Sequence, residues 1–452
     1  MKLTRALLLA VAALLAAVAV GCGSPGESDD DSSSTTATTR ATERVDVAAA
    51  GDVTLTIWDQ EVRGGQAAQI RRLNAEFQEK YPNVTINRVA KSFEDLNTTL
   101  KLAVSGPRAP DVVQANQGRP VMGQLVRARL LRPLTDYAEV YGWDDRYSDL
   151  LLNLNKFSPD ARQFGSGDLY GLSQMGEIVG VFYNRRLVRR LPETLEEFEA
   201  SLAETKRAGG VPIQFGNLDK WPGIHEYETV LGRNATPQAV SDFVFAASGA
   251  SFDTPEFTAA ARTLQDWAKA GYFTPDFNGV GYDPAWQRFA RGESPYLIAG
   301  TWLVADLIRA MGDDVGFFVL PGETAGDDPV ALGGEGLPFT VTTASKNPDV
   351  AAAYIDFITD ANAARVLVET DNLPAMSLPD GIAPTEGLTG DVFAAWRSLN
   401  EANGIIPYID YATPTFYDDI SGAIQELLAE KQSPEEFTSG VEAKYSEFTG
   451  SL

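Results

Sequence analysis

The order of apolar and polar positions predicts that the folded part of the chain opens with alternating strands and helices. Residues 53–58 alternate β-branched and apolar residues, which is typical of a strand. The next segments predict a helix at residues 66–80, a strand at 84–89, a helix at 93–105 and the start of a strand at 110–113. This order is typical of an open α/β sheet with right-handed crossovers.

The rest of the chain continues with the same kinds of pattern. Strands are predicted at residues 177–184, 211–215, 296–299, 315–320 and within 331–342, and helices at residues 185–190, 195–208, 238–244, 257–271, 282–291, 349–359, 391–400, 418–430 and 434–448. Thr194, with Glu197 three residues later, predicts a capping box, and Ser433 predicts a cap on the last helix. A chain of 452 residues with this pattern fits two domains of substantial size.

The segment at residues 292–311 combines a buried strand with a helix. Residues 296–299 are a short apolar run between a proline and a glycine, and residues 303–311 have apolar side chains at helical spacing. Thr301 is predicted to cap this helix. Trp302 lies on the turn between strand and helix, where it is either a core residue or an aromatic face offered to a ligand.

The composition is that of a globular and strongly acidic protein. The chain is 44% hydrophobic and 22% charged, with a formal net charge of −25 at pH 7. An acidic surface argues against binding to nucleic acid, which requires basic patches, and against adsorption to anionic lipid headgroups. It does not fix the sign of the charge inside a pocket. No histidine, aspartate or glutamate cluster has metal-ligand spacing, and we expect no cofactor.

The N-terminus has the pattern of a secretory signal peptide. Lys2 and Arg5 precede an apolar run at residues 6–20, which is short for a membrane span. The sequence AVGC at residues 19–22 resembles a bacterial lipobox, which implies cleavage before Cys22 and lipidation of that residue. Because Cys22 is the only cysteine, we expect no internal disulfide.

Residues 22–51 are expected to form a flexible tether behind the signal peptide of residues 1–21. The segment is rich in Ser, Thr, Asp and Ala and has almost no large apolar residue before Val45. Such a composition does not bury enough surface to offset the entropy lost on ordering.

Polar and aromatic side chains follow two of the predicted strands at the point where each strand ends. Trp58, Asp59 and Gln60 come at the end of the first strand, and Asn116 and Gln117 follow the third. Ligands of open α/β sheets bind at the C-terminal ends of the strands. These side chains are therefore either ligand contacts or ordinary polar residues of loops.

Five short motifs occur in an informative order. They are PDVV at residues 110–113, GVFYN at 180–184, FARG to AGTW at 289–302, GG to SKN at 333–347, and NLPA at 372–375. In this order, behind a lipobox, they resemble extracellular solute-binding protein family 1, the sugar-binding subunits of ABC importers that are similar to maltose-binding protein. The resemblance runs from about residue 52 to residue 448.

The resemblance implies an α/β, two-lobed periplasmic-binding-protein-like fold of type II, with the ligand in the cleft between lobes that three hinge crossings join. We place the crossings near residues 174, 338 and 398. Lobe one is expected to hold residues 52–174 and 339–398, and lobe two residues 175–338 and 399–452.

The resemblance also implies ligand-binding positions, carried over residue by residue. They are Trp58, Asp59, Gln60, Asn116, Gln117, Arg119, Glu177, Asn217, Lys220, Trp221, Trp302, Gly334, Glu335 and Phe416. Trp302 falls on the family's stacking tryptophan. The chain departs from maltodextrin binders at Ala115 and Gly118, where those proteins carry an aromatic residue and an acid, so the ligand is not expected to be simple maltodextrin.

These residue types suit a sugar, because aromatic rings stack on its apolar faces and polar side chains bind its hydroxyl groups. The predicted function is capture of a di- or oligosaccharide by a monomeric lipoprotein on the outer face of the cytoplasmic membrane, which delivers it to ABC permease subunits. The alternatives are a binder of a polyol or glycerol phosphate, a structural lipoprotein, and a surface glycosidase, which would need two carboxylates at a fixed separation.

Overall fold

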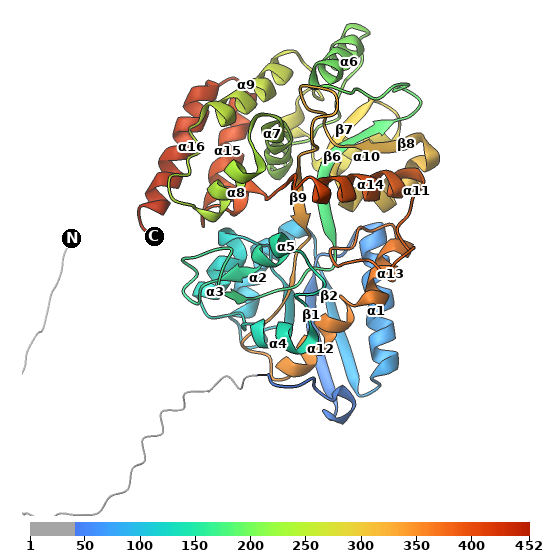
Figure 1. The fold of residues 1–452 in the computed structure, drawn as a ribbon, viewed down its shortest axis with the longest axis vertical. Coiled ribbons are helices and arrows are strands. Elements are labelled where there is room, and N and C mark those ends of the chain that lie inside the picture. Colours follow the sequence, from blue (N-terminus) through green and yellow to red (C-terminus); the bar gives the residue numbers. More distant parts are fainter. Residues whose placement is uncertain (1–40) are drawn as a thin grey trace, which may run out of the picture. The chain divides into compact units, whose positions relative to one another are not determined.

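Two mixed α/β regions, each built on its own sheet, make up the part of the chain that the structure describes (Figure 1). The structure is a computed structural model, and it describes residues 41–452. The predicted signal peptide, the lipidation of Cys22 and most of the predicted tether lie outside the described residues. The described end of that tether is not flexible: Val47 is buried in the core, and Asn83 donates to the backbone carbonyls of Val47 and Gly51, each at 2.8 Å.

The first sheet contains the strands predicted at the start of the folded chain. It consists of β1 (Val53–Asp59), β2 (Val84–Ala90), β3 (Val112–Gln114) and β10 (Phe339–Val341), in the order β10-β3-β1-β2. β1 runs parallel to β2 and β3, whereas β10 is antiparallel to β3. The side chains of Leu55 and Ile57 are fully buried in the core beneath this sheet. The ends of β1 and β3 therefore lie next to each other, as the sequence predicted.

Helices cover the first sheet, and in Figure 1 they surround β1 and β2 in the lower part of the view. They are α1 (Gly64–Lys80), α2 (Phe93–Val104), α3 (Gln124–Arg127), α4 (Thr135–Tyr141), α5 (Asp149–Asn153), α12 (Pro348–Phe357) and α13 (Ala361–Glu369). A small antiparallel pair, β4 (Lys156–Phe157) and β5 (Asp168–Leu169), and a π-helical turn, η2 (Arg119–Gly123), complete this region.

The second sheet is organised around β6 (Gly176–Asn184), in which every residue is buried. β6 pairs in antiparallel fashion with β7 (Tyr296–Gly300), β8 (Val315–Phe318) and β9 (Ala331–Glu335), and β11 (Ile405–Ile406) runs parallel to β9. Burial on both faces explains the uninterrupted apolar run in the sequence of β6.

Helices pack around the second sheet in the upper part of Figure 1. They are α6 (Leu195–Arg207), α7 (Trp221–Asn234), α8 (Pro237–Phe245), α9 (Pro255–Lys269), α10 (Tyr282–Ala290), α11 (Val304–Met311), α14 (Gly387–Glu401), α15 (Phe416–Leu428) and α16 (Pro434–Thr449). Short 3₁₀ turns are η1 (Val47–Ala49), η3 (Phe277–Gly279), η4 (Thr301–Leu303), η5 (Gly312–Asp314) and η6 (Ile409–Tyr411). No helix among residues 41–452 has the length and apolarity needed to cross a bilayer.

The chain passes between the two sheets at three places. Leu172 bridges to Phe339 of the first sheet just before β6 begins, and β9 of the second sheet is followed by β10 of the first. The third passage lies between α13, which packs on α1, and α14, which packs on β8. We therefore propose that the third boundary lies between α13 and α14 rather than near residue 398.

Several predicted local features differ from the structure. The helix predicted at residues 185–190 is a set of turns, because the side chain of Asn184 accepts a hydrogen bond from the backbone N–H of Arg186. The strand predicted at residues 211–215 is reduced to isolated bridges of Ile213. Five helices were not predicted: the short α3, α4 and α5, and the longer α7 and α13.

The predicted helix caps are partly confirmed. Ser433 and Glu436 form a complete capping box. Thr194 caps α6, but the carboxylate of Glu197 accepts a hydrogen bond from the backbone N–H of Glu193 instead of completing the box. Thr301 is not the cap of α11, since its hydroxyl accepts a hydrogen bond from the backbone N–H of Ile178 at 3.3 Å. This bond fixes the η4 turn to β6.

Candidate functional site

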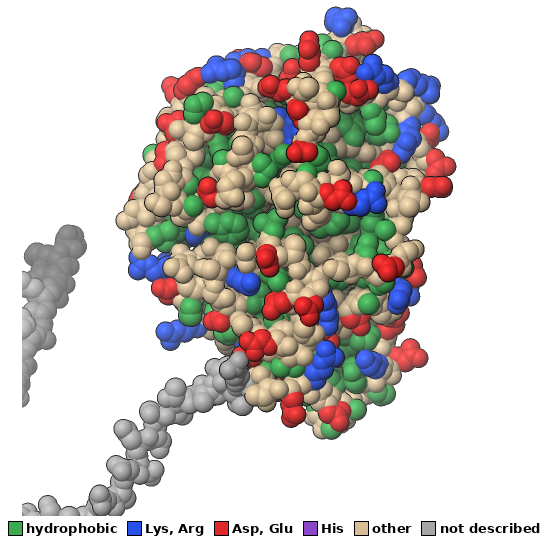
Figure 2. All heavy atoms as spheres, in the orientation of Figure 1, with side chains coloured by type: hydrophobic (Ala, Val, Ile, Leu, Met, Phe, Trp, Pro, Cys, Tyr) green, Lys and Arg blue, Asp and Glu red, His purple; other side chains and the backbone are tan. Residues whose placement is uncertain are grey.

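A cavity of about 910 Å³ lies where the two α/β regions meet. The first region contributes Gln60, Val62, Arg63, Gly64, Gln66, Ala67, Arg71, Ser92, Phe93, Glu94 and Asn116 to its lining. The second contributes Asp219, Trp221, Ile224, His225, Gly281, Tyr282, Asp283, Pro284, Trp302, Asp306 and Arg309. Glu177, Glu335, Leu337, Tyr408, Asp410, Tyr411 and Tyr417 line it from β6, β9 and the segments beside them. Figure 2 shows acidic and basic side chains interspersed over the face in view.

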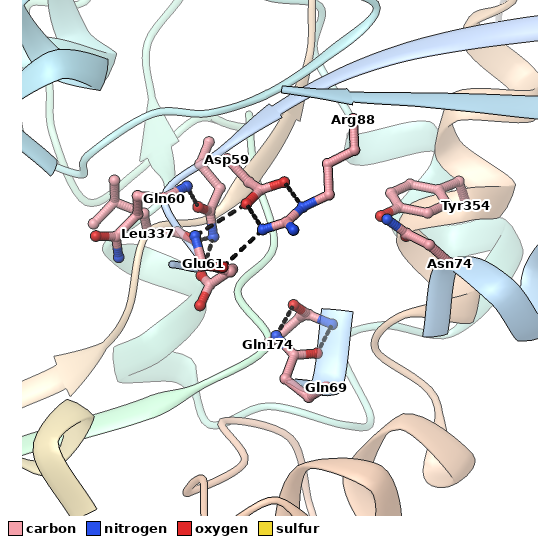
Figure 3. Close-up of polar contacts among 10 residues, drawn as sticks. Asp59, Gln60, Glu61, Gln69, Asn74, Arg88, Gln174, Leu337 and Tyr354 are labelled. Carbon is pink, nitrogen blue, oxygen red and sulfur yellow. Dashed lines mark hydrogen bonds and ion pairs between the residues drawn. The ribbon is translucent and has the colours of Figure 1, made fainter. Parts of the chain in front are cut away.

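The end of β1 is held by an ion pair between Asp59 and Arg88 (Figure 3). Asp59 is fully buried, and Arg88 of β2 donates to both of its carboxylate oxygens at 2.6 and 2.5 Å. Arg88 also donates to the backbone carbonyl of Glu61 at 2.7 Å, and Asp59 accepts the backbone N–H of Glu61 at 3.0 Å. Burial raises the pKa of Asp59, and the hydrogen bonds from Arg88 oppose that rise. The pair fixes the turn that presents Gln60 to the cavity.

Gln114, at the end of β3, extends this network. Its side-chain amide donates to Glu61 at 2.7 Å and to the backbone carbonyl of Leu337 at 3.0 Å, while its side-chain oxygen accepts the backbone N–H of Gln60 at 2.8 Å. The ends of β1 and β3 are thereby joined to the passage between β9 and β10. Burial raises the pKa of Glu61 to about 8.

Carboxyl groups form the inner surface of the cavity. Glu177 comes from β6, Glu335 from β9 and Asp410 from η6, and all three are buried. Burial raises the pKa of Glu177 to about 8, with a further contribution from the charge of Glu335. Burial also raises the pKa of Glu335 to about 8 and that of Asp410 to about 7. At neutral pH Glu177 and Glu335 are therefore largely available as hydrogen-bond donors as well as acceptors, and Asp410 is about half protonated.

Aromatic side chains form the wall on the side of the second sheet. The indole N–H of Trp302 donates to the hydroxyl of Tyr282 at 2.7 Å, and the rings of Trp221 and Tyr282 lie 4.4 Å apart. His225 packs against Trp302 at 5.6 Å and Tyr408 at 5.4 Å. Burial lowers the pKa of His225 to about 3, so this imidazole is neutral at physiological pH.

The turn that carries Trp302 depends on the glycine before it. A Cβ atom at Gly300 would lie about 2.0 Å from the indole ring of Trp302. Any larger residue at this position would therefore displace the ring from the cavity wall. This is the physical reason for the Gly-Thr-Trp sequence at the end of β7.

An ion pair joins the two regions at the mouth of the cavity. Arg63, just before α1, donates to Asp283 of α10 at 3.0 Å, and its guanidinium group lies 5.5 Å from the centre of the Tyr282 ring. The first helix also approaches α11 closely, because a Cβ atom at Gly64 would clash with the side chains of Asp306 and Arg309.

Six of the fourteen predicted ligand positions line the cavity. They are Gln60, Asn116, Glu177, Trp221, Trp302 and Glu335. They come from elements far apart in the sequence, and the structure brings them to a single cavity. The other eight predicted positions do not line it.

Four of these eight belong to the first region or support its edge. Trp58 is half-buried beneath the ammonium group of Lys91, and Asp59 is bound by Arg88. Gln117 donates to the backbone carbonyl of Gly336 at 2.8 Å, so it supports the passage next to Glu335. Arg119 is buried and donates to the backbone carbonyls of Val244 and Ala412, each at 2.9 Å, and burial lowers its pKa to about 10.

The other four belong to the second region. Asn217 is buried and accepts the backbone N–H of Gly223, which fixes the start of α7. Lys220, with a φ of 69°, is the residue just before that helix. Gly334 lies within β9 with a φ of 139°. Phe416 is fully buried among other core aromatic rings, so the prediction that it forms a wall of the cleft is wrong.

The sequence analysis missed several residues of the cavity. Tyr408, Asp410 and Tyr411 lie together in the sequence YIDY directly after the short strand β11. A strand end rich in aromatic and acidic residues is a usable signal, but a strand of two residues has too little pattern to be predicted. Tyr282 was assigned only to a helix, because nothing in its sequence shows that the first turn of α10 faces a cavity.

Comparison with known proteins identifies the family and the fold. Residues 64–365 match the family model described as bacterial extracellular solute-binding protein. The chain is 22% identical over 410 residues to the melibiose/raffinose/stachyose-binding protein MelE of Bacillus subtilis, covering 87% of this chain and 89% of that protein. It is 24% identical over 281 residues to the maltotriose-binding protein of Pyrococcus abyssi, covering 61% and 55% of the two chains.

A solved structure described as a chitin oligosaccharide binding protein superimposes with a TM-score of 0.74 at 22% identity, covering 88% of this chain and 99% of that one. At this identity the likeness concerns the fold. It confirms the predicted α/β, two-lobed fold of type II.

Proposed function

The chain belongs to the bacterial extracellular solute-binding protein family, and from this premise we propose that it captures a di- or oligosaccharide and delivers it to the permease subunits of an ABC importer. The observation that carries the proposal is the cavity in which the aromatic wall of Trp221, Tyr282 and Trp302 faces the buried acids Glu177 and Glu335. Apolar ring faces opposite hydroxyl-binding groups are the two requirements of a sugar site.

Unpartnered polar atoms support the same proposal. Among the described residues, the indole N–H of Trp221, the hydroxyl of Tyr408 and one carboxylate oxygen of Glu335 are buried and lack a hydrogen-bond partner. All three residues line the cavity. Buried polar groups are normally hydrogen-bonded, so these atoms are suited to ligand hydroxyl groups. A volume of about 910 Å³ lies near the upper end of the range for small-molecule sites, which favours more than one sugar ring.

The names of the relatives support the ligand class. One relative is named for melibiose, raffinose and stachyose and another for maltotriose, all of which are di- or oligosaccharides. Because these relatives share less than a quarter of their aligned residues with this chain, they support the class of ligand and not a particular sugar.

The charges of the cavity argue against the anionic alternative, glycerol phosphate. Arg63 is bound by Asp283 and Arg309 by Asp306, so these two cations at the mouth are already neutralised. The third arginine of the lining, Arg71, is exposed on α1, and any carboxyl group of the inner surface that is ionised would repel a phosphate. A glycosidase also has acids in its site, but membership in a family of binding proteins favours capture without catalysis.

The proposal includes the attachment of the protein to the membrane. Signal-peptide cleavage and lipidation at Cys22 would place the monomer on the outer face of the cytoplasmic membrane, and the segment between Cys22 and about residue 40 would act as its tether. Mass spectrometry of the membrane-associated protein tests this step. A Cys22→Ser variant is expected to be released from the membrane fraction.

A thermal-shift screen over mono-, di- and trisaccharides tests the ligand class. Binding to the folded state raises the melting temperature through the term RT ln(1 + [L]/Kd). At least one di- or oligosaccharide is expected to raise the melting temperature and to be recovered without hydrolysis. If no carbohydrate changes the melting temperature, the saccharide proposal is wrong, and hydrolysis products would favour the glycosidase.

A further inference from the structure

A second hollow in the described part of the protein has a volume of about 1030 Å³ and shares no lining residue with the saccharide cavity. Its walls come from α2, η2, α3, the loop between β4 and β5, and the C-terminal end of α16 (Figure 1). We refer to it as the basic groove, because its lining includes Lys101, Arg119, Arg127, Arg129 and Arg162. The chain as a whole has a formal net charge of −25, so this concentration of positive charge is a local feature.

Three of these cations are exposed and free of ion pairs. They are Lys101, Arg127 and Arg129. Within residues 41–452, none of the three forms an ion pair with a side-chain carboxyl group. Lys101 donates to the side-chain oxygen of Gln124 at 3.4 Å, which does not neutralise its charge. All three charges therefore act on an anion that enters the groove.

Arg119 adds a buried cation without a counter-charge. The residue is only 2% exposed, and its guanidinium group donates to the backbone carbonyls of Val244 and Ala412, each at 2.9 Å. The guanidinium carbon lies 5.4 Å from the centre of the Phe164 ring and 5.2 Å from that of Phe448, which also lines the groove. These contacts stabilise the cation but do not neutralise it. Among the described residues, its Nε atom is one of the few buried side-chain atoms that lack a hydrogen-bond partner.

The two other charged residues of the lining are engaged locally. Arg162 donates to the backbone carbonyls of Ser451, at 2.8 Å, and of Leu452. Asp160 is the only acid among the described residues that line the groove. It is exposed and accepts hydrogen bonds from the hydroxyl of Ser158 at 2.7 Å and from the backbone N–H of Arg162 at 3.2 Å. The other four cations therefore give the groove a positive potential.

We propose that the basic groove binds a phosphate group, which is carried by a soluble phosphate or by an anionic lipid headgroup. A phosphate presents several acceptor oxygens and more than one negative charge, and the planar guanidinium group matches that geometry with paired N–H donors. Four cations at one groove favour such an anion over a single carboxylate. The site lies outside the saccharide cavity, so the inference is independent of the proposed function.

The acidic composition of the chain does not contradict this site. The total charge led to the expectation that anionic headgroups are repelled, but salt screens exposed charges beyond about 8 Å at physiological ionic strength. An anion in the groove therefore responds to the cations of the lining and not to acids on distant helices. Phe448 and Pro414 add apolar surface to the lining, which can contact the glycerol part of a lipid headgroup.

Isothermal titration calorimetry of the purified protein at low salt tests the site. The probes are inorganic phosphate, pyrophosphate, dihexanoyl phosphatidylglycerol and dihexanoyl phosphatidylcholine, with the two lipids kept below the concentration at which they form micelles. At least one of the first three is expected to bind, and its affinity is expected to fall about tenfold when NaCl is raised from roughly 20 to 200 mM. Phosphatidylcholine, which has no net charge, is expected not to bind.

The order of affinities identifies the source of the phosphate group. Tighter binding of phosphatidylglycerol than of the two inorganic anions assigns the groove to a lipid headgroup. The reverse order assigns it to a soluble phosphate. Both results support the proposal, because the chemistry that is recognised is the same.

Paired substitutions assign the binding to the groove. Arg127→Gln combined with Arg129→Gln removes two exposed cations of the lining and is expected to weaken phosphate binding about tenfold or more. Arg189→Gln combined with Arg207→Gln is the matched control, because both arginines are exposed, lie outside the groove and change the net charge by the same amount. The control is expected to keep the affinity of the unchanged protein, and circular dichroism checks that both variants fold.

Three results would overturn the inference without affecting the proposal of saccharide capture. The first is the absence of binding by any of the three anionic probes, including the case in which a hexa-aspartate peptide binds instead. The second is an equal affinity for phosphate in the groove variant and the control variant. The third is phosphate binding that a bound saccharide abolishes by competition, which would place the anion at the arginines that line the saccharide cavity.

Discussion

Two buried groups of acids at the centre of this protein differ in their cation: Arg88 binds Asp59 of the first group, and no ion pair among the described residues binds Glu177 or Glu335 of the second. Asp59 and Glu61 are tied to the fold by Arg88 and Gln114, with hydrogen bonds of 2.5–3.0 Å. Glu177 and Glu335 have no cation and face the cavity. Burial alone therefore does not distinguish a structural acid from a binding acid. The arginine does: Arg88 satisfies both carboxylate oxygens of Asp59, whereas Glu61 and Glu335 each keep one buried carboxylate oxygen without a partner.

The largest effect on stability is expected from removing Arg88, the partner of Asp59. Arg88→Met removes the donor to Asp59 and leaves a buried carboxylate uncompensated, which is expected to lower the free energy of unfolding by about 3–5 kcal/mol. Urea denaturation measures the change. Arg72→Met is the matched control, because its ion pair with Glu369 is exposed and its loss is expected to cost about 0–1 kcal/mol. An equal loss in the free energy of unfolding for the two variants would contradict the structural role assigned to the Arg88–Asp59 pair.

The second-largest effect is expected on ligand affinity, from changes in the aromatic wall that lines the same cavity as Glu177 and Glu335. Trp302→Ala removes the stacking surface and is expected to weaken saccharide binding by about 2 kcal/mol or more, roughly 30-fold. Phe416→Leu serves as the comparison, since this fully buried ring belongs to the core. It is expected to lower stability by about 1–3 kcal/mol while the Kd of the folded protein stays the same. A large change in Kd for the Phe416 variant would instead support the prediction from the sequence that Phe416 contacts the ligand.

A smaller effect is expected from pH. Glu177 and Glu335 have pKa values raised to about 8 in the folded state, so between pH 6.5 and pH 8 the folded protein binds more protons than the unfolded chain. Stability of the ligand-free protein therefore falls as pH rises through this window, by about 1–2 kcal/mol for each carboxyl group. His225, with its pKa lowered to about 3 in the folded state, acts in the opposite direction and mainly below pH 6.5, where the unfolded chain protonates this imidazole. Urea titrations of Glu335→Gln are expected to give a shallower fall, and an identical slope would contradict the assignment.

The smallest effect is expected at the mouth of the cavity. Asp283→Asn removes the ion pair between Arg63 and α10, whose partners are partly exposed, with 24% of the Arg63 side chain and 56% of the Asp283 side chain accessible. The expected cost is below about 1 kcal/mol in stability, with a few-fold increase in the ligand dissociation rate. Stopped-flow fluorescence of the tryptophans in the wall measures that rate. An unchanged ligand dissociation rate would show that the Arg63–Asp283 ion pair is a surface contact with no part in retaining the ligand.

The sequence predicted the fold well because burial leaves a strong local pattern. The alternation in β1, the apolar run of β6 and the spacing in α9 each follow from the faces that these elements bury. The start of α7 was missed, because it depends on Lys220 with a φ of 69° and on a contact from Asn217, which no periodicity reveals. The domain boundaries remain predictions. The packing of α14 on β8 favours placing the third boundary between α13 and α14 instead of near residue 398.

The candidate site was predicted only in part, for a physical reason. Gln60, Glu177 and Trp302 were chosen because they lie near the end of a strand, and they line the cavity. A position near a strand end does not reveal which way its side chain points. Asp59 lies next to Gln60 and turns to Arg88 instead, because neighbouring side chains of a strand leave opposite faces. Phe416 has the chemistry of a sugar-stacking residue, and only the packing of α15 shows that it is core.

The most direct test of the account is an experimental structure with a bound saccharide. We predict electron density for a sugar with a ring face on Trp302 and with polar groups on Glu177 and Glu335, while the bonds between Arg88 and Asp59 remain as they are in the ligand-free protein. A saccharide bound outside this cavity, or one that separates Asp59 from Arg88 to make its own contacts, would contradict the assignment of one acid group to the fold and the other to the ligand.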